Sequence, residues 1–76
     1  MRFTDLDVSA AIWVETGIQP CVFLEPGKSL VTIEFPTDEK IQDVICSYTT
    51  GDLRQSVKTF AARRMQLYRL CREVKR

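Results

Sequence analysis

The sequence of 76 residues contains no histidine, only three glycines and only three cysteines. Without histidine, the commonest general base of enzymes is absent, and the glycines stand alone at turns rather than in a phosphate-binding loop. The cysteines, Cys21, Cys46 and Cys71, lie far apart in the sequence, which excludes a CxxC-type metal site and predicts reduced thiols. We therefore expect no enzymatic activity, no cofactor and no small-molecule substrate.

Long hydrophobic runs are also missing. No segment approaches the roughly 20 apolar residues that a membrane-spanning helix needs. Asp5 and Asp7 lie where a signal peptide would be apolar. We expect one cytoplasmic domain, residues 1–76, without membrane contact. A chain this short buries a modest share of its surface, and association with further copies is a common remedy.

Positive charge is concentrated in the last third of the chain. Residues 51–76 hold eight Lys or Arg against two acids, a net charge of +6, whereas residues 1–50 carry a net charge of −5. The total of +1 therefore conceals a dipolar molecule. This asymmetry is the one feature of the composition that bears on partners.

The first predicted element is a helix. Thr4 and Asp7 form a capping-box-like pair ahead of an apolar stretch, and Gly17 suits the left-handed residue that ends a helix. Apolar residues fall on two sides of this helix, so we expect it to be well buried or to lie between two layers.

Two strands are predicted next, as an antiparallel hairpin of residues 21–25 and 29–35. Pro26 and Gly27 occupy the central positions of a type II turn, and alternating apolar and polar residues mark the second strand as half-buried. Residues 1–3 could supply a short third strand.

Two further helices complete the predicted α+β fold. Thr37 is the predicted N-cap of the first, which has one apolar face and ends at Gly51. Asp52 is the predicted N-cap of the last helix, residues 52–75, which would be about 36 Å long. Because a domain of this size is only about 30 Å across, we expect this helix to overhang or to pack on a second molecule.

The last helix carries a row of cations on one side. At 100° per residue, five of them fall within about 60° of one another beside the apolar stripe. These are Arg54, Lys58, Arg69, Arg72 and Arg76. Such a row could contact nucleic-acid phosphates. We favour a solvated face attracted to the acids of residues 1–50, because the total charge near zero argues against strong non-specific DNA binding.

Arg64 lies inside the apolar stripe of the same helix. A charged group there must reach solvent or find a partner. Asp5, Asp7 and Glu34 are the candidates, and we expect a partly buried structural ion pair that fixes how the last helix docks.

Several distinct short segments follow one another in an order and spacing that cover nearly the whole chain. They are Phe3-Thr4-Asp5-Leu6, Ala10-Ala11, Gly17, Ile33-Glu34-Phe35, Tyr48-Thr49-Thr50-Gly51 and Phe60 with the Arg-rich stretch after it. In this order and spacing the chain resembles a family of small uncharacterised domains from bacteria and their phages. The resemblance implies no activity, cofactor or site residue, since none is assigned to that family.

The predicted function is that of a non-enzymatic protein–protein interaction or assembly module that associates with itself as a homodimer, or with another protein. Two features favour it: a small sheet with free edges, and a helix longer than the body of the domain. The alternative is nucleic-acid binding through the basic row.

Overall fold

The computed structural model describes residues 1–27 and 29–75. These residues form six elements: β1 (Arg2–Phe3), α1 (Leu6–Thr16), β2 (Cys21–Leu24), β3 (Val31–Glu34), α2 (Glu39–Thr50) and α3 (Val57–Lys75). The order confirms the predicted α+β fold, including the short N-terminal strand. Both hairpin strands are shorter than predicted.

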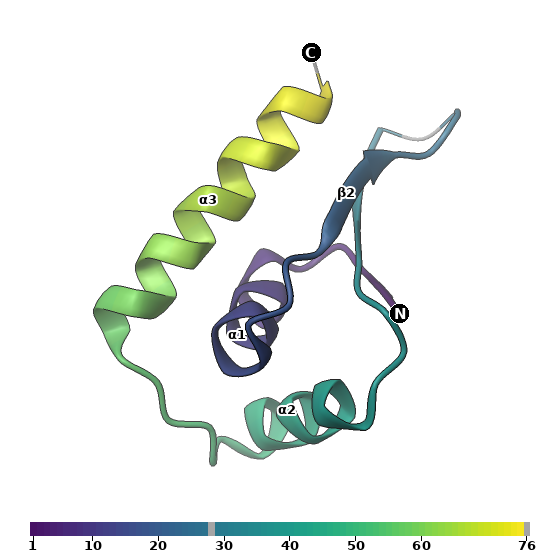
Figure 1. Cartoon of the computed structure of the whole chain (residues 1–76). Coiled ribbons are helices and arrows are strands. Elements are labelled where there is room, and N and C mark those ends of the chain that lie inside the picture. The colour runs from purple at the N-terminus through teal and green to yellow at the C-terminus, as the bar shows by residue number, and fades with distance from the viewer. Residues whose placement is uncertain (28, 76) are drawn as a thin grey trace.

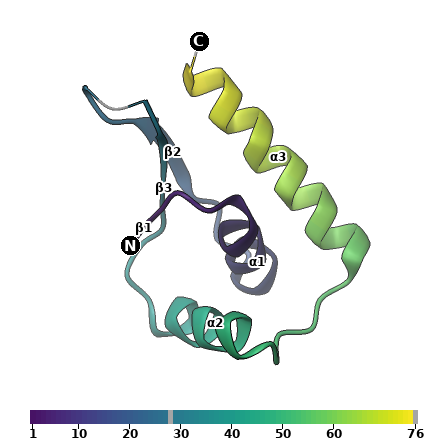
Figure 2. The ribbon, with the colours of Figure 1, turned by 180° about the vertical axis from the view of Figure 1, so that it is seen from behind.

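Helix α1 forms the centre of the molecule. It lies between α2, α3 and the sheet (Figures 1 and 2). Ala10, Ala11 and Ile12 are at most 1% exposed, although they point in three directions around the helix. The apolar residues on both sides of this helix therefore each meet a neighbouring element, as their pattern predicts.

Both of the first two helices begin with an aspartate cap. The Asp5 carboxylate accepts hydrogen bonds from the N–H groups of Asp7 and Val8, and Asp38 accepts one from Lys40. The predicted caps, each the threonine immediately before, are wrong by one residue. A charged carboxylate is a stronger acceptor than a hydroxyl and is favoured by the helix dipole, so the aspartate takes the position.

The sheet is antiparallel in the order β1-β3-β2, so β3 lies in the middle. Ile33 is opposite Phe3 on one side and Val22 on the other. Directly opposed residues point to the same face, and this face joins the hydrophobic core with Phe35 and the fully buried Leu67 of α3. Gly27 has the positive φ of +78° that the predicted turn requires, while Lys28 lies outside the described residues.

The chain after α2 is not helical, contrary to the prediction that Asp52 starts the last helix. Gly51 ends α2 in the left-handed conformation, with φ of +82°. The next two N–H groups, of Asp52 and Leu53, then both donate to the carbonyl of Ser47. These bonds close the end of α2 and turn the chain away from the helical path.

Gln55 holds this connecting segment against α1. Its Nε2 donates to the carbonyl of Ala11 at 2.9 Å and to Oε1 of Glu15 at 3.1 Å. A tertiary contact between residues 44 apart therefore overrides the local helix propensity of the segment.

Helix α3 is accordingly shorter than predicted. It has 19 residues and is about 28 Å long at 1.5 Å per residue. Its C-terminal half runs beside the hairpin in both views (Figures 1 and 2). The helix is therefore no longer than the body of about 30 Å that a domain of this size has. The expectation of an overhanging helix is wrong, and it no longer supports self-association.

Candidate functional site

The described helical part of the basic row consists of Lys58, Arg69 and Arg72, which are all exposed on α3. The first and last are about 21 Å apart along the axis at 1.5 Å per residue. Arg54 precedes α3 and therefore does not belong to the helical row, contrary to its predicted position. Arg76 lies outside the described residues. We call the three helical cations the basic ridge.

The basic ridge makes no ion pair with any residue among 1–27 and 29–75. The guanidinium of Arg72 lies 5.9 Å from the ring centroid of Tyr68, which is half exposed. Among residues 1–27 and 29–75, the ion pairs of Asp7, Glu25 and Glu34 are with Arg2 and Arg64 and not with the ridge. In the described chain the ridge is therefore a solvated face, and paired acids do not neutralise it.

Arg64 forms an ion pair with Asp7, one of its three predicted partners. Its Nε lies 2.5 Å from Oδ1 of Asp7, and this hydrogen bond and charge raise the pKa of Arg64 above its ordinary value. The two side chains are 47% and 50% exposed, so the pair lies at the surface and is not partly buried as predicted. It joins the middle of α3 to the first turn of α1.

The neighbouring Arg63 contacts the core, which sequence reasoning missed. Its guanidinium lies 4.8 Å from the ring centroid of the buried Trp13, and its Nη1 donates to Oε1 of Gln66 at 2.9 Å. Arg63 is thus a packing residue between α3 and α1 rather than a free surface cation.

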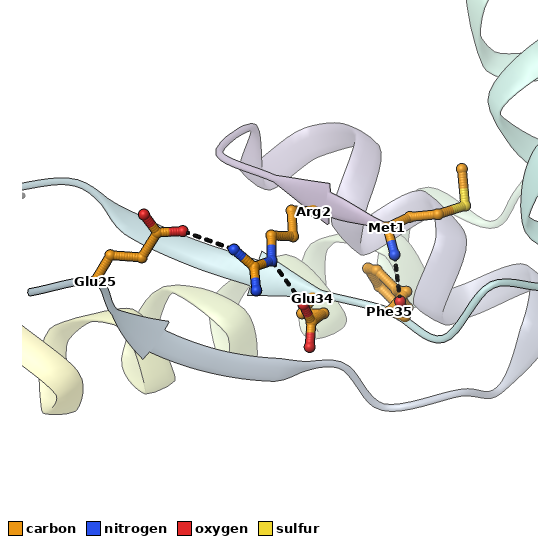
Figure 3. A network of polar contacts seen from close by, with 5 residues as sticks. All are labelled: Met1, Arg2, Glu25, Glu34 and Phe35. Atoms are coloured by element: carbon orange, nitrogen blue, oxygen red, sulfur yellow. Dashed lines mark hydrogen bonds and ion pairs between the residues drawn. The ribbon is translucent and has the colours of Figure 1, made fainter.

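A polar network covers the face of the sheet opposite the core (Figure 3). Arg2 donates from Nε to Glu34 at 2.8 Å and from Nη1 to Glu25 at 3.1 Å, and its guanidinium lies 5.4 Å from the centroid of Phe23. The hydrogen bond and charge of Glu34 are the main cause of the raised pKa of Arg2. Because these partners are 23 and 32 residues away, no local sequence signal identifies them.

Strand β2 is an open edge, as the hydrogen-bond pattern of the sheet shows. The amino group of Met1 donates to the carbonyl of Phe35 at 2.7 Å (Figure 3), and the N–H of Phe35 donates back to the carbonyl of Met1 at 2.8 Å. In antiparallel sheets hydrogen-bonded and non-hydrogen-bonded pairs alternate, so Cys21 and Phe23 direct their N–H and C=O groups toward β3. Val22 and Leu24 consequently direct theirs away from the sheet.

No backbone group in the described chain meets this outward side of β2. The strand lies nearest the viewer in Figure 1, with no other element in front of it. Its sequence, Cys-Val-Phe-Leu, contains no charge, and Leu24 is 39% exposed. The open edge, defined as the outward side of Val22 and Leu24, is therefore apolar and has no backbone partner within the described chain.

A shallow apolar pocket of about 330 Å³ lies where α2, α3 and the connecting segment meet. Tyr48, Leu53, Val57 and Phe60 form most of its wall, without any charged side chain. In residues 1–27 and 29–75 no group of three or more His, Cys, Asp or Glu side chains could hold a metal ion.

Within the described residues no helix is both long and apolar enough to cross a bilayer. A scan against protein-family models and searches of curated proteins and of solved structures found no match. The resemblance to small bacterial and phage domains stays a prediction.

Proposed function

We propose that this protein is a non-enzymatic interaction module that associates with a second copy of itself. The observation that carries the proposal is the open edge of β2. Unpaired N–H and C=O groups on an apolar edge strand form a template for a further strand, and proteins usually protect such edges by charge, shortness or a covering element.

The other edge of the sheet shows that protection. Strand β1 has only two residues, and one of them is the charged Arg2. Strand β2 has neither safeguard along its length. Pro20 and Pro26 flank it and limit how far pairing could extend, since proline cannot donate to a ladder. The edge of β2 can therefore pair with another strand, but only over the few residues between the two prolines. This favours a defined partner over open-ended aggregation.

Sedimentation velocity from low micromolar to millimolar concentrations tests self-association. We expect a reversible shift from monomer to dimer that changes little with salt, because the open edge carries no charge. A single monomeric species over the whole range would contradict the proposal.

Nucleic-acid binding through the basic ridge is the second candidate. It is supported by the exposure of Lys58, Arg69 and Arg72 and by the absence of any carboxylate partner for them in the described residues. Three phosphate contacts would give a slope of about −3 for log affinity against log salt concentration on B-DNA.

A mobility-shift assay with mixed-sequence DNA and RNA tests this candidate. The double variant Arg69→Glu/Arg72→Glu should abolish any shift, while Lys40→Glu, an exposed change on α2, should preserve most of it. Undiminished binding by the double variant would rule out the ridge as the site.

We also propose that the protein is cytoplasmic. Cys21, Cys46 and Cys71 are free thiols, and two of them are exposed, which fits the reducing cytoplasm.

A further inference from the structure

We infer that two copies pair β2 against β2 around a twofold axis through Phe23, so that two three-stranded sheets become one of six strands. This inference rests on the proposed self-association and specifies its surface and register. The same side of the sheet must face the core in both copies, so the twofold axis runs perpendicular to the sheet. Only registers that keep each side chain on its own face are then allowed.

Three such registers, centred on Val22, Phe23 and Leu24, pair the outward groups of Val22 or Leu24 with those of Val22 or Leu24 in the other copy. In a register centred on Phe23, Val22 of each copy is opposite Leu24 of the other, and both are outward-facing residues. Each pair exchanges two hydrogen bonds, so every outward N–H and C=O of the two residues is satisfied.

The competing registers are centred on Val22 and on Leu24. The first places Leu24 opposite Pro20 of the other copy, and the second places Val22 opposite Pro26. Because proline has no N–H, the carbonyl opposite it is left without a donor in both copies. Unsatisfied backbone groups are costly once an interface excludes water, so the register centred on Phe23 is favoured.

The side chains agree with this register. Phe23 of the two copies would form a directly opposed, non-hydrogen-bonded pair, the closest kind of contact across an antiparallel ladder. The guanidinium of Arg2 already lies over the ring of each Phe23. On the core side, the exposed Leu24 would cover Val22 of the other copy.

The side of α3 that faces the β2 edge would be the surface at which the α3 helices of the two copies come together. Both α3 helices would lie on one face of the joined sheet and meet along the flank that looks toward the β2 edge. Arg64 and Tyr68 mark the other flank, since Arg64 binds Asp7 and Tyr68 shares a groove with Leu6, just after β1. At 100° per residue, Gln66 and Leu70 lie on the opposite side of the buried stripe.

Charge also favours this contact over others between two α3 helices. The β2-side flank carries Glu73 and one cation, Arg63, which Trp13 and Gln66 already engage. The basic ridge points away from the core and would not face its counterpart. Two strongly basic helices can thus lie together without opposing rows of cations.

The substitution Leu24→Pro tests the open edge. It removes an outward N–H while leaving the bonds from β2 to β3 intact, so the fold should persist, as circular dichroism would show. We expect at least a tenfold weaker dimer than with Leu24→Ala, the matched control that truncates the side chain and keeps the N–H. Equal dissociation constants for the two variants would overturn pairing through this edge.

Disulfide trapping tests the register independently of Leu24→Pro. In a chain with the three native cysteines replaced by serine, Phe23→Cys should form an intermolecular disulfide on mild oxidation, and Val22→Cys should do so much more slowly. Trapping through Val22→Cys alone, or through neither variant while the protein still dimerises, would overturn the register and leave self-association standing. A monomeric native protein would overturn both.

Discussion

Leu67 of α3 provides the most direct test of how the long helix is held. Its side chain is 0% exposed and belongs to the cluster that joins α3 to α1 and the sheet. Replacing a fully buried leucine by alanine costs about 2–5 kcal/mol. A protein of 76 residues has a total free energy of unfolding of about 4–11 kcal/mol, so Leu67→Ala should remove a large fraction of it.

Urea unfolding followed by the fluorescence of Trp13 measures this loss. With a urea dependence of about 1 kcal/mol per molar for so small a protein, the midpoint should fall by about 2 M or more. Met65→Ala is the control, because Met65 is 52% exposed on the same helix and its loss should cost less than about 0.5 kcal/mol. Both variants must be compared at one concentration, since dimerisation adds stability. Equal midpoints for the two variants would refute the described docking of α3.

Three other predictions concern the caps, the connecting segment and the thiols. Asp5→Ala should lower the free energy of unfolding, measured by urea titration, by about 0.5–2 kcal/mol, as the loss of an N-cap does. Thr4→Ala should change it by less than about 0.5 kcal/mol. A larger loss for Thr4→Ala than for Asp5→Ala would favour the predicted threonine cap. Gln55→Ala should cost about 1 kcal/mol and speed limited proteolysis within residues 52–56, and an unchanged cleavage rate would contradict the anchoring role of Gln55. Burial raises the pKa of the Cys71 thiol, so Cys71 should react with a thiol reagent more slowly than the exposed Cys46, and equal rates would count against it. Since the folded pKa of Cys71 lies above the unfolded one, its contribution to stability is present below the unfolded pKa and is lost as the pH rises through the folded pKa.

Local signals predicted the element order well. Gly17 and Gly51 end helices in the left-handed conformation, and the alternation along β3 marks a strand, because each depends on residues close in sequence. The short strand β1 could be predicted only as an option, since its pairing with β3 links residues 30 and 32 positions apart.

The missed features depend on contacts that no local pattern carries. The segment before α3 is not helical because the bonds to Ser47 close α2 and because the side chain of Gln55 binds α1. Arg54 lies in this non-helical segment and therefore does not belong to the predicted basic row. Arg63 packs on Trp13 because α3 docks against α1, a contact that no local pattern indicates.

The open edge of β2 could be identified only once the register of the sheet was known. An apolar run such as β2 predicts a strand but not which residues direct their backbone groups outward. Pro20 and Pro26 were the available signal, because paired prolines often bound an edge strand. The bond exchange between Met1 and Phe35 then fixed the alternation through β3 to β2.

Amide hydrogen exchange along β2 at two protein concentrations tests the central claim most directly. Cys21 and Phe23 donate to β3, so their N–H groups should be protected at both concentrations. The N–H groups of Val22 and Leu24 should exchange freely in dilute protein and become protected as the concentration rises and dimers form. If Val22 and Leu24 stay unprotected at high concentration while Cys21 and Phe23 are protected, the open edge of β2 is not the surface through which this protein associates.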